Sequence, residues 1–329
     1  MTSRLTRAAY LFTLHLWQRM GGIGNAFSGE ACGVVQLAAD AADADRQRAI
    51  ARQWRYPPEF AQWLDAAEAA PLLAGGQSDG GWLFARGGWV YPKEVCEAML
   101  AACGPLLERR FTREATGLAW QDDCWQVRDA SGAVLAQAQT VILANGTNAT
   151  IFPQTDKLPL SAIRGQVTHL SAESLPLLPM VVCGEGYLTR PIQGICCVGA
   201  SYDFDADPML RRDSQEENLE RLARLLPEAV GSETLAGRVG FRCVTPDRLP
   251  LVGALPDQTA PIGGSRLRDV PRLPGLHGLL GYGSRGLIWA PFAAELLASW
   301  LEGEPLPVEP ELAAALDPAR FILKAHRRT

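Results

Sequence analysis

The chain has 329 residues, of which 47% are hydrophobic and 20% are charged, and its formal net charge is −5. This composition is that of an ordinary globular protein, long enough for one large domain or two interleaved ones. It excludes a global basic field toward nucleic acid, although not a local basic patch, and the lack of any run of about 18 apolar residues argues against a membrane span.

Predicted helices and short strands alternate in the first third of the chain. Apolar positions recur at helical spacing near its start, where Arg7 and His15 interrupt them, so an amphipathic helix is predicted there and not a signal peptide. "CGVVQLA" (32–38) predicts a short buried strand, and "GGWLFARGGWVYP" (80–92) predicts strands around glycines. The helices are predicted at residues 3–20, 43–54, 57–76 and 92–104.

Strands dominate the middle of the chain. Residues 109–146 predict short strands that turn at 122–123 and 131–132 and end in the apolar strand "TVILANG" (140–146). An apolar run that ends in asparagine and glycine is typical of a buried strand that ends at a topological switch point of the sheet, where a ligand comes close. Further strands, and then a helix, are predicted at 164–201 and 214–229.

The stretch "GYGSRG" (281–286) has the spacing G-x-G-x-x-G and opens an apolar helix that runs to about Trp300. This pattern normally starts a dinucleotide-binding domain, whose βαβ unit needs about 30 residues and a second parallel strand. Here the helix is followed by "GEPLPVEPEL", which is too rich in proline for a central strand. The loop is therefore not predicted to open such a domain, and a tight strand-to-helix turn remains an open interpretation.

A second segment, "GFRCVTPDRLPLVG" (240–253), places Arg242 and Arg248 around a rigid loop. An arginine presented in this way suits a carboxylate or a phosphate, which it binds through two parallel hydrogen bonds. A surface salt bridge is the alternative for either arginine taken alone.

The eight cysteines form no C-x-x-C pair, and only four widely spread histidines accompany them. We predict that the cysteines are buried small hydrophobes in a reducing cytoplasm, in preference to a metal site or a disulfide framework.

An ordered set of segments across nearly the whole chain resembles the FAD-dependent amino-acid and amine oxidase (DAO) superfamily, which includes glycine, sarcosine and D-amino-acid oxidases. More closely, the set is similar to the C-terminal flavin domain of the MnmC family, the bifunctional enzymes of tRNA 5-methylaminomethyl-2-thiouridine biosynthesis. The segments are "CGVVQLA", "GGWVYPKEVC", "DDCW", "VILANG", "RGQVTHL", "GYLTRP", "CVGASY", "GFRCVTPDRLPLVG", "GSRGLIWAP" and "ALDPARF".

The resemblance implies an α/β (α+β) fold. A DAO-like FAD-binding domain with an incomplete parallel sheet would be interleaved with a substrate domain built on an antiparallel sheet. The FAD-binding domain is expected at 1–24, 91–159 and 238–302, the substrate domain at 25–90 and 160–237, and a C-terminal extension at 303–329.

The resemblance also implies FAD as the cofactor, with the glycine loop beside the flavin. The N-terminus of the following helix would point at the isoalloxazine edge, where backbone N–H groups and the helix dipole stabilise negative charge on the reduced flavin. The residues implied at the flavin are Gly281, Gly283, Ser284, Arg285, Gly286 and Leu287, and those implied near the dinucleotide are Ala144, Asn145 and Gly146.

The start of the chain departs from the family pattern. Family members begin with a strand, the pyrophosphate-binding G-x-G-x-x-G and an acidic residue for the ribose, and no such set precedes the first predicted helix. The first βαβ unit is therefore expected to be missing, as in a truncated or mis-started gene model or a decaying gene. Because the diphosphate loses its helix N-terminus, we expect the chain as written to bind FAD poorly or not at all.

The family reaction removes the carboxymethyl group of 5-carboxymethylaminomethyl-2-thiouridine at the tRNA wobble position and leaves 5-aminomethyl-2-thiouridine. A hydride passes from the glycine α-carbon to the flavin, and the imine hydrolyses to glyoxylate. By resemblance, Arg242 grips the glycine carboxylate, Tyr187 walls the pocket, and Arg285 assists the carboxylate or neutralises the reduced flavin. The alternatives are that Tyr187 is a core aromatic and that Arg285 is a packing residue at the helix end.

Two other functions remain open. The chain is alternatively a free glycine- or sarcosine-type amine oxidase, which needs no tRNA surface, or a non-catalytic remnant that binds no FAD. "RGQVTHL" and "GGWVYPKEVC" favour the tRNA enzyme. Its expected partners are tRNA and a methyltransferase domain or partner that completes the pathway. The expected location is cytoplasmic, with no metal and no membrane involved.

Overall fold

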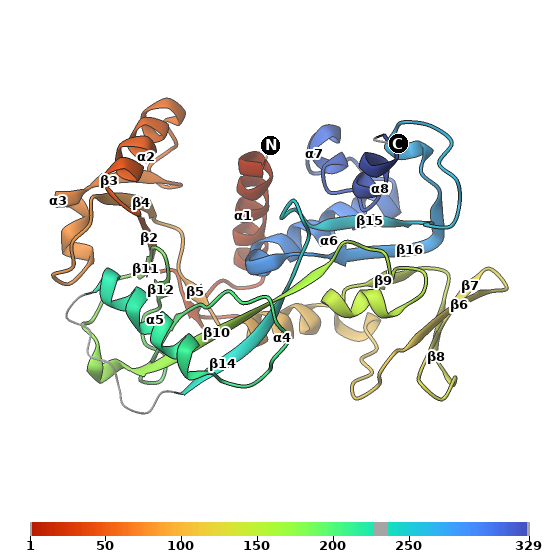
Figure 1. Cartoon of the computed structure of the whole chain (residues 1–329), viewed down its shortest axis with the longest axis horizontal. Coiled ribbons are helices and arrows are strands. Elements are labelled where there is room, and N and C mark those ends of the chain that lie inside the picture. Colours follow the sequence, from red (N-terminus) through yellow and green to blue (C-terminus); the bar gives the residue numbers. More distant parts are fainter. Residues whose placement is uncertain (1, 227–235, 328–329) are drawn as a thin grey trace. The chain divides into compact units, whose positions relative to one another are not determined.

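The computed structural model describes residues 2–226 and 236–327 (Figure 1). This described part of the chain divides into two compact units, each built from segments that are separate in sequence. We call them the glycine-loop unit and the large-sheet unit. The glycine-loop unit comprises Met1–Arg19, Cys103–Ile163 and Arg242–Thr329, and the large-sheet unit comprises Met20–Ala102 and Arg164–Phe241.

The predicted domain segments differ from this division by a few residues at 20–24, 160–163 and 238–241, and by longer stretches at two further places. Residues 91–102, predicted in the FAD-binding domain, belong to the large-sheet unit, where Glu94 accepts a hydrogen bond from the Ser28 backbone N–H at 2.7 Å. Residues 303–329, predicted as a separate extension, belong to the glycine-loop unit, where Leu312 is buried in the core. Which unit binds FAD and which binds substrate stays a prediction.

A mainly antiparallel sheet forms the centre of the large-sheet unit. Its order over the described residues is β14-β10-β13-β12-β11-β2-β4-β3, with β2 and β11 paired in parallel. The strands are β2 (Val34–Leu37), β3 (Gln62–Asp65), β4 (Gly80–Phe84), β10 (Ser161–Ser171), β11 (Val181–Cys183), β12 (Tyr187–Leu188), β13 (Ile195–Gly199) and β14 (Ala236–Val244). The other elements are β1 (Gly29–Glu30), β5 (Trp89–Val90), α2 (Ala41–Trp54), α3 (Ala66–Ala69), α4 (Pro92–Ala102) and α5 (Arg212–Leu225).

The core of this unit lies between the sheet and α5 (Figure 1). Val35 and Val182 come from adjacent strands and are fully buried, and α5 packs Leu222 and Leu225 into the same cluster. The helix predicted over 214–229 is thus found as α5, and the last three residues of that prediction, 227–229, lie outside the described residues.

The helix predicted over 57–76 is wrong for most of its length. The chain forms β3 there, and α3 follows after Asp65. Trp63 of β3 packs edge-on against Trp82 of β4, with ring centroids 6.0 Å apart, so cross-strand pairing outweighs the local helical spacing. Asp65 and Glu68 then form the capping box that starts α3.

The glycine-loop unit holds two small sheets. Over its described residues, one sheet has the order β15-β16-β9 and the other is the antiparallel meander β6-β7-β8. β9 and β16 run parallel, whereas β15 and β16 run antiparallel, so the expected incomplete parallel sheet is one parallel pair extended by an antiparallel strand. The strands are β6 (Gly117–Gln121), β7 (Cys124–Arg128), β8 (Val134–Ala138), β9 (Val141–Leu143), β15 (Leu251–Pro256) and β16 (Arg272–Leu280).

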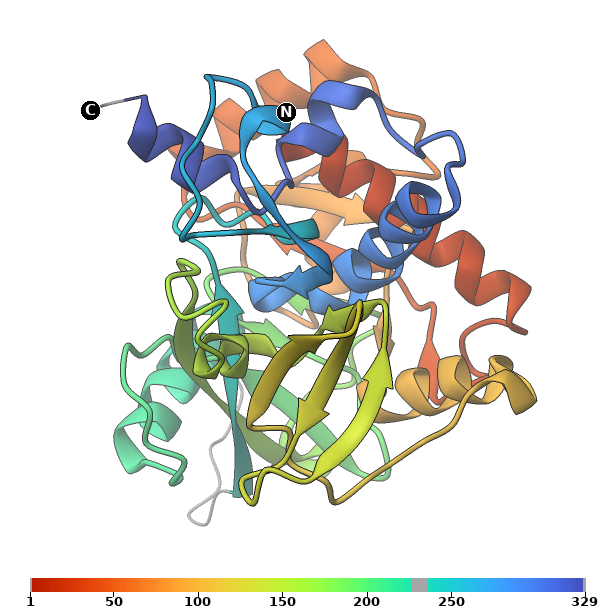
Figure 2. The ribbon, with the colours of Figure 1, turned by 90° about the vertical axis from the view of Figure 1, so that its right-hand side faces the viewer.

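Tight turns join the strands of the meander, which faces the viewer in Figure 2. Asp122 and Asp123 connect β6 to β7 with φ angles of 51° and 56°, as a two-residue hairpin turn requires. Gly132, with φ 83°, lies between β7 and β8. Both turns were predicted at these positions, and the structure confirms them.

Two helices, α1 and α6, pack against each other in the glycine-loop unit. Leu5 and Ala9 of α1 are fully buried against Trp289 of α6. The buried Thr13 hydroxyl donates to the Ile288 carbonyl oxygen at 3.0 Å, which ties the helices together. The helices of this unit are α1 (Thr2–Arg19), α6 (Gly286–Glu302), α7 (Pro310–Ala314) and α8 (Arg320–His326).

Burial differs from prediction at two places. In β9, Leu143 is buried but Ile142 is 44% exposed, because α1 and α6 pack over β15 and β16 and not over this outer strand. The eight cysteines form no disulfide, but the prediction that they are buried is confirmed only for Cys196: Cys96 and Cys103 are exposed, and the other five are partly buried. Cys96 lies on α4, and Cys103 follows the end of that helix.

Candidate functional site

The glycine loop follows β16 and bends sharply before α6 starts. Gly281 and Gly283 have φ angles of 76° and 58°, in the left-handed region that favours glycine. A Cβ atom on Gly281 would lie 2.9 Å from Thr245 Cγ2, closer than packed carbon atoms come. Arg285, the residue before α6, makes no side-chain capping hydrogen bond, and the positive end of the helix dipole at the start of α6 suits an anion.

Three segments meet at this edge of the glycine-loop unit. Because β9 and β16 are parallel, their carboxyl ends lie on the same side of the sheet, and residues 144–146 follow β9 as the glycine loop follows β16. A Cβ atom on Gly146 would lie 3.7 Å from Cys243 Cβ, and one on Gly283 would lie 3.5 Å from Val244 Cγ1. The structure thus brings the predicted cofactor segments together around residues 243–245.

The exposure of the predicted cofactor residues shows which of them face outward. Gly281 is buried, and Gly146, Gly283, Arg285 and Gly286 are partly buried. The exposed members are Ala144, Asn145, Ser284 and Leu287.

A carboxylate clamp, which the sequence analysis missed, holds the loop after β14. Asp247 accepts two hydrogen bonds from the Arg320 guanidinium, at 2.8 and 2.9 Å, and one from the Leu249 amide at 3.1 Å. The Thr245 hydroxyl donates to the Leu249 carbonyl oxygen at 2.7 Å. Burial pushes the pKa of Asp247 up, but Arg320, the Leu249 amide and the Thr245 hydroxyl together outweigh burial and hold that pKa below its ordinary value.

Two further residues of the site have perturbed acidities. Burial raises the pKa of the Cys243 thiol, and a hydrogen bond with the Gly281 backbone partly offsets this rise. Burial also raises the pKa of the Tyr282 hydroxyl. Both side chains are therefore uncharged at neutral pH. Their place directly beside Arg242 and Gly281 in sequence is the signal that could have identified them.

The three predicted catalytic residues fall in different units. Arg242 lies near the end of β14, and Arg285 ends the turn before α6; both are partly buried and belong to the glycine-loop unit. Arg242 lies two residues before Val244, and Arg285 lies two residues after Gly283, which approaches Val244 closely. Tyr187 lies in the large-sheet unit, so its proximity to the two arginines stays a prediction.

The environment of Tyr187 agrees both with a residue that walls a substrate pocket and with a core aromatic residue. A hydrogen bond joins its side chain to the Cys197 thiol, whose pKa burial nevertheless raises. A Cβ atom on Gly199 would lie 3.1 Å from the Tyr187 hydroxyl, so glycine leaves room for this ring. Arg248, the other candidate of the sequence analysis, is exposed and has a φ angle of 59°.

These residues fit one end of FAD. A loop that only glycine fits and the amides at the start of a 17-residue helix suit a flat ring that gains negative charge. The outer edge of β9 carries no strand among the residues that the structure describes, and Ile142 lies exposed there. The fit therefore extends to the flavin ring and not to a diphosphate-binding loop.

The chain belongs to the FAD dependent oxidoreductase (DAO) family, whose match covers residues 2–300. It is therefore a member of a family of flavin-dependent oxidoreductases, and the predicted fold class is confirmed.

Within this family the chain is similar to the tRNA 5-methylaminomethyl-2-thiouridine biosynthesis bifunctional protein MnmC of Burkholderia thailandensis, at 44% identity over 340 aligned residues. The alignment covers 100% of this chain and 52% of that protein. The protein of the same name from Burkholderia mallei is 44% identical over 339 residues, which cover 99% of this chain and 52% of that protein. The chain thus spans about half the length of the curated relatives it matches.

Solved structures share the fold. Glycine oxidase from Geobacillus kaustophilus superposes with a TM-score of 0.75 at 21% identity, covering 96% of this chain and 82% of that one. Iminodiacetate oxidase (IdaA) from Chelativorans sp. BNC1 also gives a TM-score of 0.75, at 22% identity, covering 94% of this chain and 83% of that one. None of the helices described for this chain is long and apolar enough to cross a membrane.

Proposed function

We propose that this chain is a flavin-dependent oxidase of tRNA wobble-uridine modification, which converts 5-carboxymethylaminomethyl-2-thiouridine to 5-aminomethyl-2-thiouridine. The observation that carries the proposal is the glycine loop at the start of α6, in a chain 44% identical to MnmC proteins along its whole length. The name of those relatives includes tRNA and a 5-methylaminomethyl product, which contains the same amine with one methyl group more.

Residues 281–287 would hold FAD by its ring end, and residues 144–146 would lie near its dinucleotide part. The chemistry that bound FAD supplies is acceptance of a hydride from the carbon beside an amine nitrogen. The substrate loses this hydride from its glycine α-carbon and a proton from its nitrogen. Water then adds to the C=N bond, and the products are the 5-aminomethyl nucleoside and glyoxylate.

The remaining task of the chain is to orient the substrate. Arg242 would bind the glycine carboxylate through two hydrogen bonds, which fixes the α-carbon that reacts. The clamp of Asp247 and Arg320 holds the loop that follows β14 and so keeps the end of this strand rigid. Arg285 would add positive charge at the start of α6, and Tyr187 would wall the pocket.

The proposal includes two partners and a location. The substrate is tRNA, and because the relatives' product carries a further methyl group, a methyltransferase domain or partner must act on the amine. A cytoplasmic location follows from the tRNA substrate and agrees with the free cysteines.

The test is turnover of undermodified tRNA by the purified chain with excess FAD, followed by mass analysis of the nucleosides. Loss of the carboxymethyl mass with release of glyoxylate supports the proposal. Oxidation of free sarcosine without any change in the tRNA would instead identify a small-molecule amine oxidase. Failure with both substrates, together with no flavin binding, would identify a non-catalytic remnant.

Arg242→Gln gives a sharper test of the site. We expect kcat/KM for tRNA to fall about 10- to 100-fold, because charge-assisted hydrogen bonds to the carboxylate are lost. The matched control is Arg238→Gln, since Arg238 is an exposed arginine on the same strand. Equal kinetics of the two variants would remove Arg242 from the site.

A further inference from the structure

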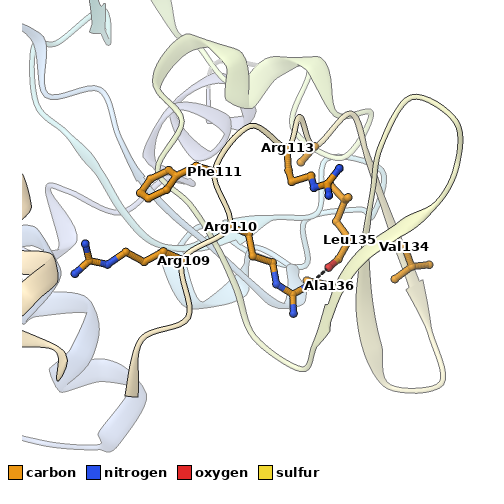
Figure 3. A pocket seen from close by; sticks show the side chains of 8 residues that line it. Arg109, Arg110, Phe111, Arg113, Val134, Leu135 and Ala136 are labelled. Carbon is orange, nitrogen blue, oxygen red and sulfur yellow. Dashed lines mark hydrogen bonds between the residues drawn. The ribbon is translucent and has the colours of Figure 1, made fainter. Parts of the chain in front are cut away.

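A cationic hollow lies in the glycine-loop unit, in a part of it that the mechanism above does not use. It measures about 690 Å³ and is formed by the segment before β6 and by the edge strand β8. We call it the arginine hollow. Its lining includes Arg109, Arg110, Phe111 and Arg113 on one side and Val134 to Ala136 of β8 on the other (Figure 3).

One arginine builds the hollow and two remain available for a ligand. Arg110 donates to the Leu135 carbonyl oxygen of β8 and to Glu108 at 2.7 Å, so it anchors the segment. Arg109 and Arg113 are exposed, and no ion pair joins either of them to a carboxylate within the described residues. Arg113 interacts electrostatically with Asp129 and helps to lower the pKa of that carboxyl, but without a direct ion pair. Both guanidinium groups thus remain exposed to a ligand beside an anchored wall.

The backbone of the segment also turns an aromatic ring outward. Thr112 has a φ angle of 55°, and its hydroxyl donates to the Phe111 carbonyl oxygen at 2.7 Å. Phe111 is 70% exposed, and Figure 3 shows it on the side of Arg109, away from β8. An exposed phenyl ring close in sequence to two exposed guanidinium groups is a combination that binds single-stranded nucleic acid, by stacking on a base and by pairing with phosphates.

Two observations favour RNA over a protein strand as the occupant. A strand added to β8 would need its free edge carbonyls, and Arg110 already occupies that of Leu135. An acidic peptide would satisfy the arginines but would leave Phe111 without a flat partner. We therefore propose that the arginine hollow binds the tRNA substrate, with Arg109 and Arg113 on backbone phosphates and Phe111 stacked on an unpaired base; this deepens the proposed function and rests on it.

The experiment measures binding of fluorescently labelled, undermodified tRNA to the full chain by anisotropy, between about 50 and 200 mM salt. The double variant Arg109→Gln/Arg113→Gln is expected to bind about tenfold more weakly, with a salt slope reduced by about 1.5, because two phosphate contacts are lost. Phe111→Ala is expected to weaken binding about fivefold or more, whereas Phe111→Trp is expected to bind tRNA as tightly as the wild type does.

Two controls separate this effect from loss of charge or of fold. Arg212→Gln removes one positive charge, half of what the double variant removes, from an exposed side chain on α5 and is expected to leave binding unchanged. Thermal unfolding of every variant is expected to match that of the wild type, because the substituted side chains are exposed.

The outcomes distinguish this inference from the proposed function. If the wild type turns over tRNA and the variants bind it equally well, the arginine hollow is not an RNA site, and the proposed function stands. If the variants lose binding but the wild type turns over no tRNA, the hollow stands and the proposed function fails. A wild type that binds no tRNA, or variants that lose a co-purifying protein instead, would overturn the inference.

Discussion

Single residues of the glycine loop are constrained by both conformation and space. We expect Gly281→Ala to destabilise the glycine-loop unit by about 1 to 3 kcal/mol, because its φ angle of 76° strains a Cβ atom that also meets Thr245 at 2.9 Å. Denaturant unfolding measures this difference. Gly132→Ala is the matched control, with φ 83° but nothing within 4 Å of its Cβ position. If both variants lose the same stability, the close approach to Thr245 is unimportant.

The charge of Asp247 is expected to make the stability of the protein depend on pH. Its folded-state pKa lies below its ordinary value, so its contribution to stability is complete above about pH 4 and is lost as the pH falls through the folded pKa. We expect Asp247→Asn to lose about 1 to 2 kcal/mol of unfolding free energy at pH 7, since the pair with Arg320 is partly exposed. The difference from the wild type is expected to shrink toward pH 3 in denaturant titrations; a constant difference would contradict the prediction.

Helix packing decides stability at the scale of elements. Leu5 is fully buried between α1 and the core of the glycine-loop unit, so Leu5→Ala is expected to reduce the free energy of unfolding by about 2 to 5 kcal/mol. Leu11 of the same helix is 39% exposed, and Leu11→Ala is expected to have a much smaller effect. Chemical denaturation of both variants gives the comparison. Similar losses would mean that α1 is not held by its buried face.

Elements also show where local sequence is an insufficient guide. The spacing of apolar residues predicted α1 because this helix has one buried face that repeats at helical period. It failed over 57–76, where Trp63 pairs with Trp82 from a different strand. Helical period is set by neighbours in sequence, whereas a strand depends on a partner that the local pattern does not contain.

Flavin affinity is a property of the whole molecule. The described residues provide a glycine loop with a long helix for the ring end of FAD, and β9 has a free outer edge. We expect weak flavin binding, in which purification removes the flavin and excess FAD restores the visible absorption spectrum. A stoichiometric yellow protein directly after purification would contradict this prediction.

The sequence by itself determined the glycine loop, the helices with one buried face and the turn at Asp122 and Asp123, since each depends on residues that are close along the chain. It also determined the family, through the order of short segments along nearly the whole chain. Only the tertiary structure decided that residues 144–146, 243–245 and 281–283 meet, that Arg320 clamps Asp247, and that Ile142 is exposed on an outer strand. The physical reason is that contacts between distant segments depend on how strands pair and helices pack, which local spacing does not specify.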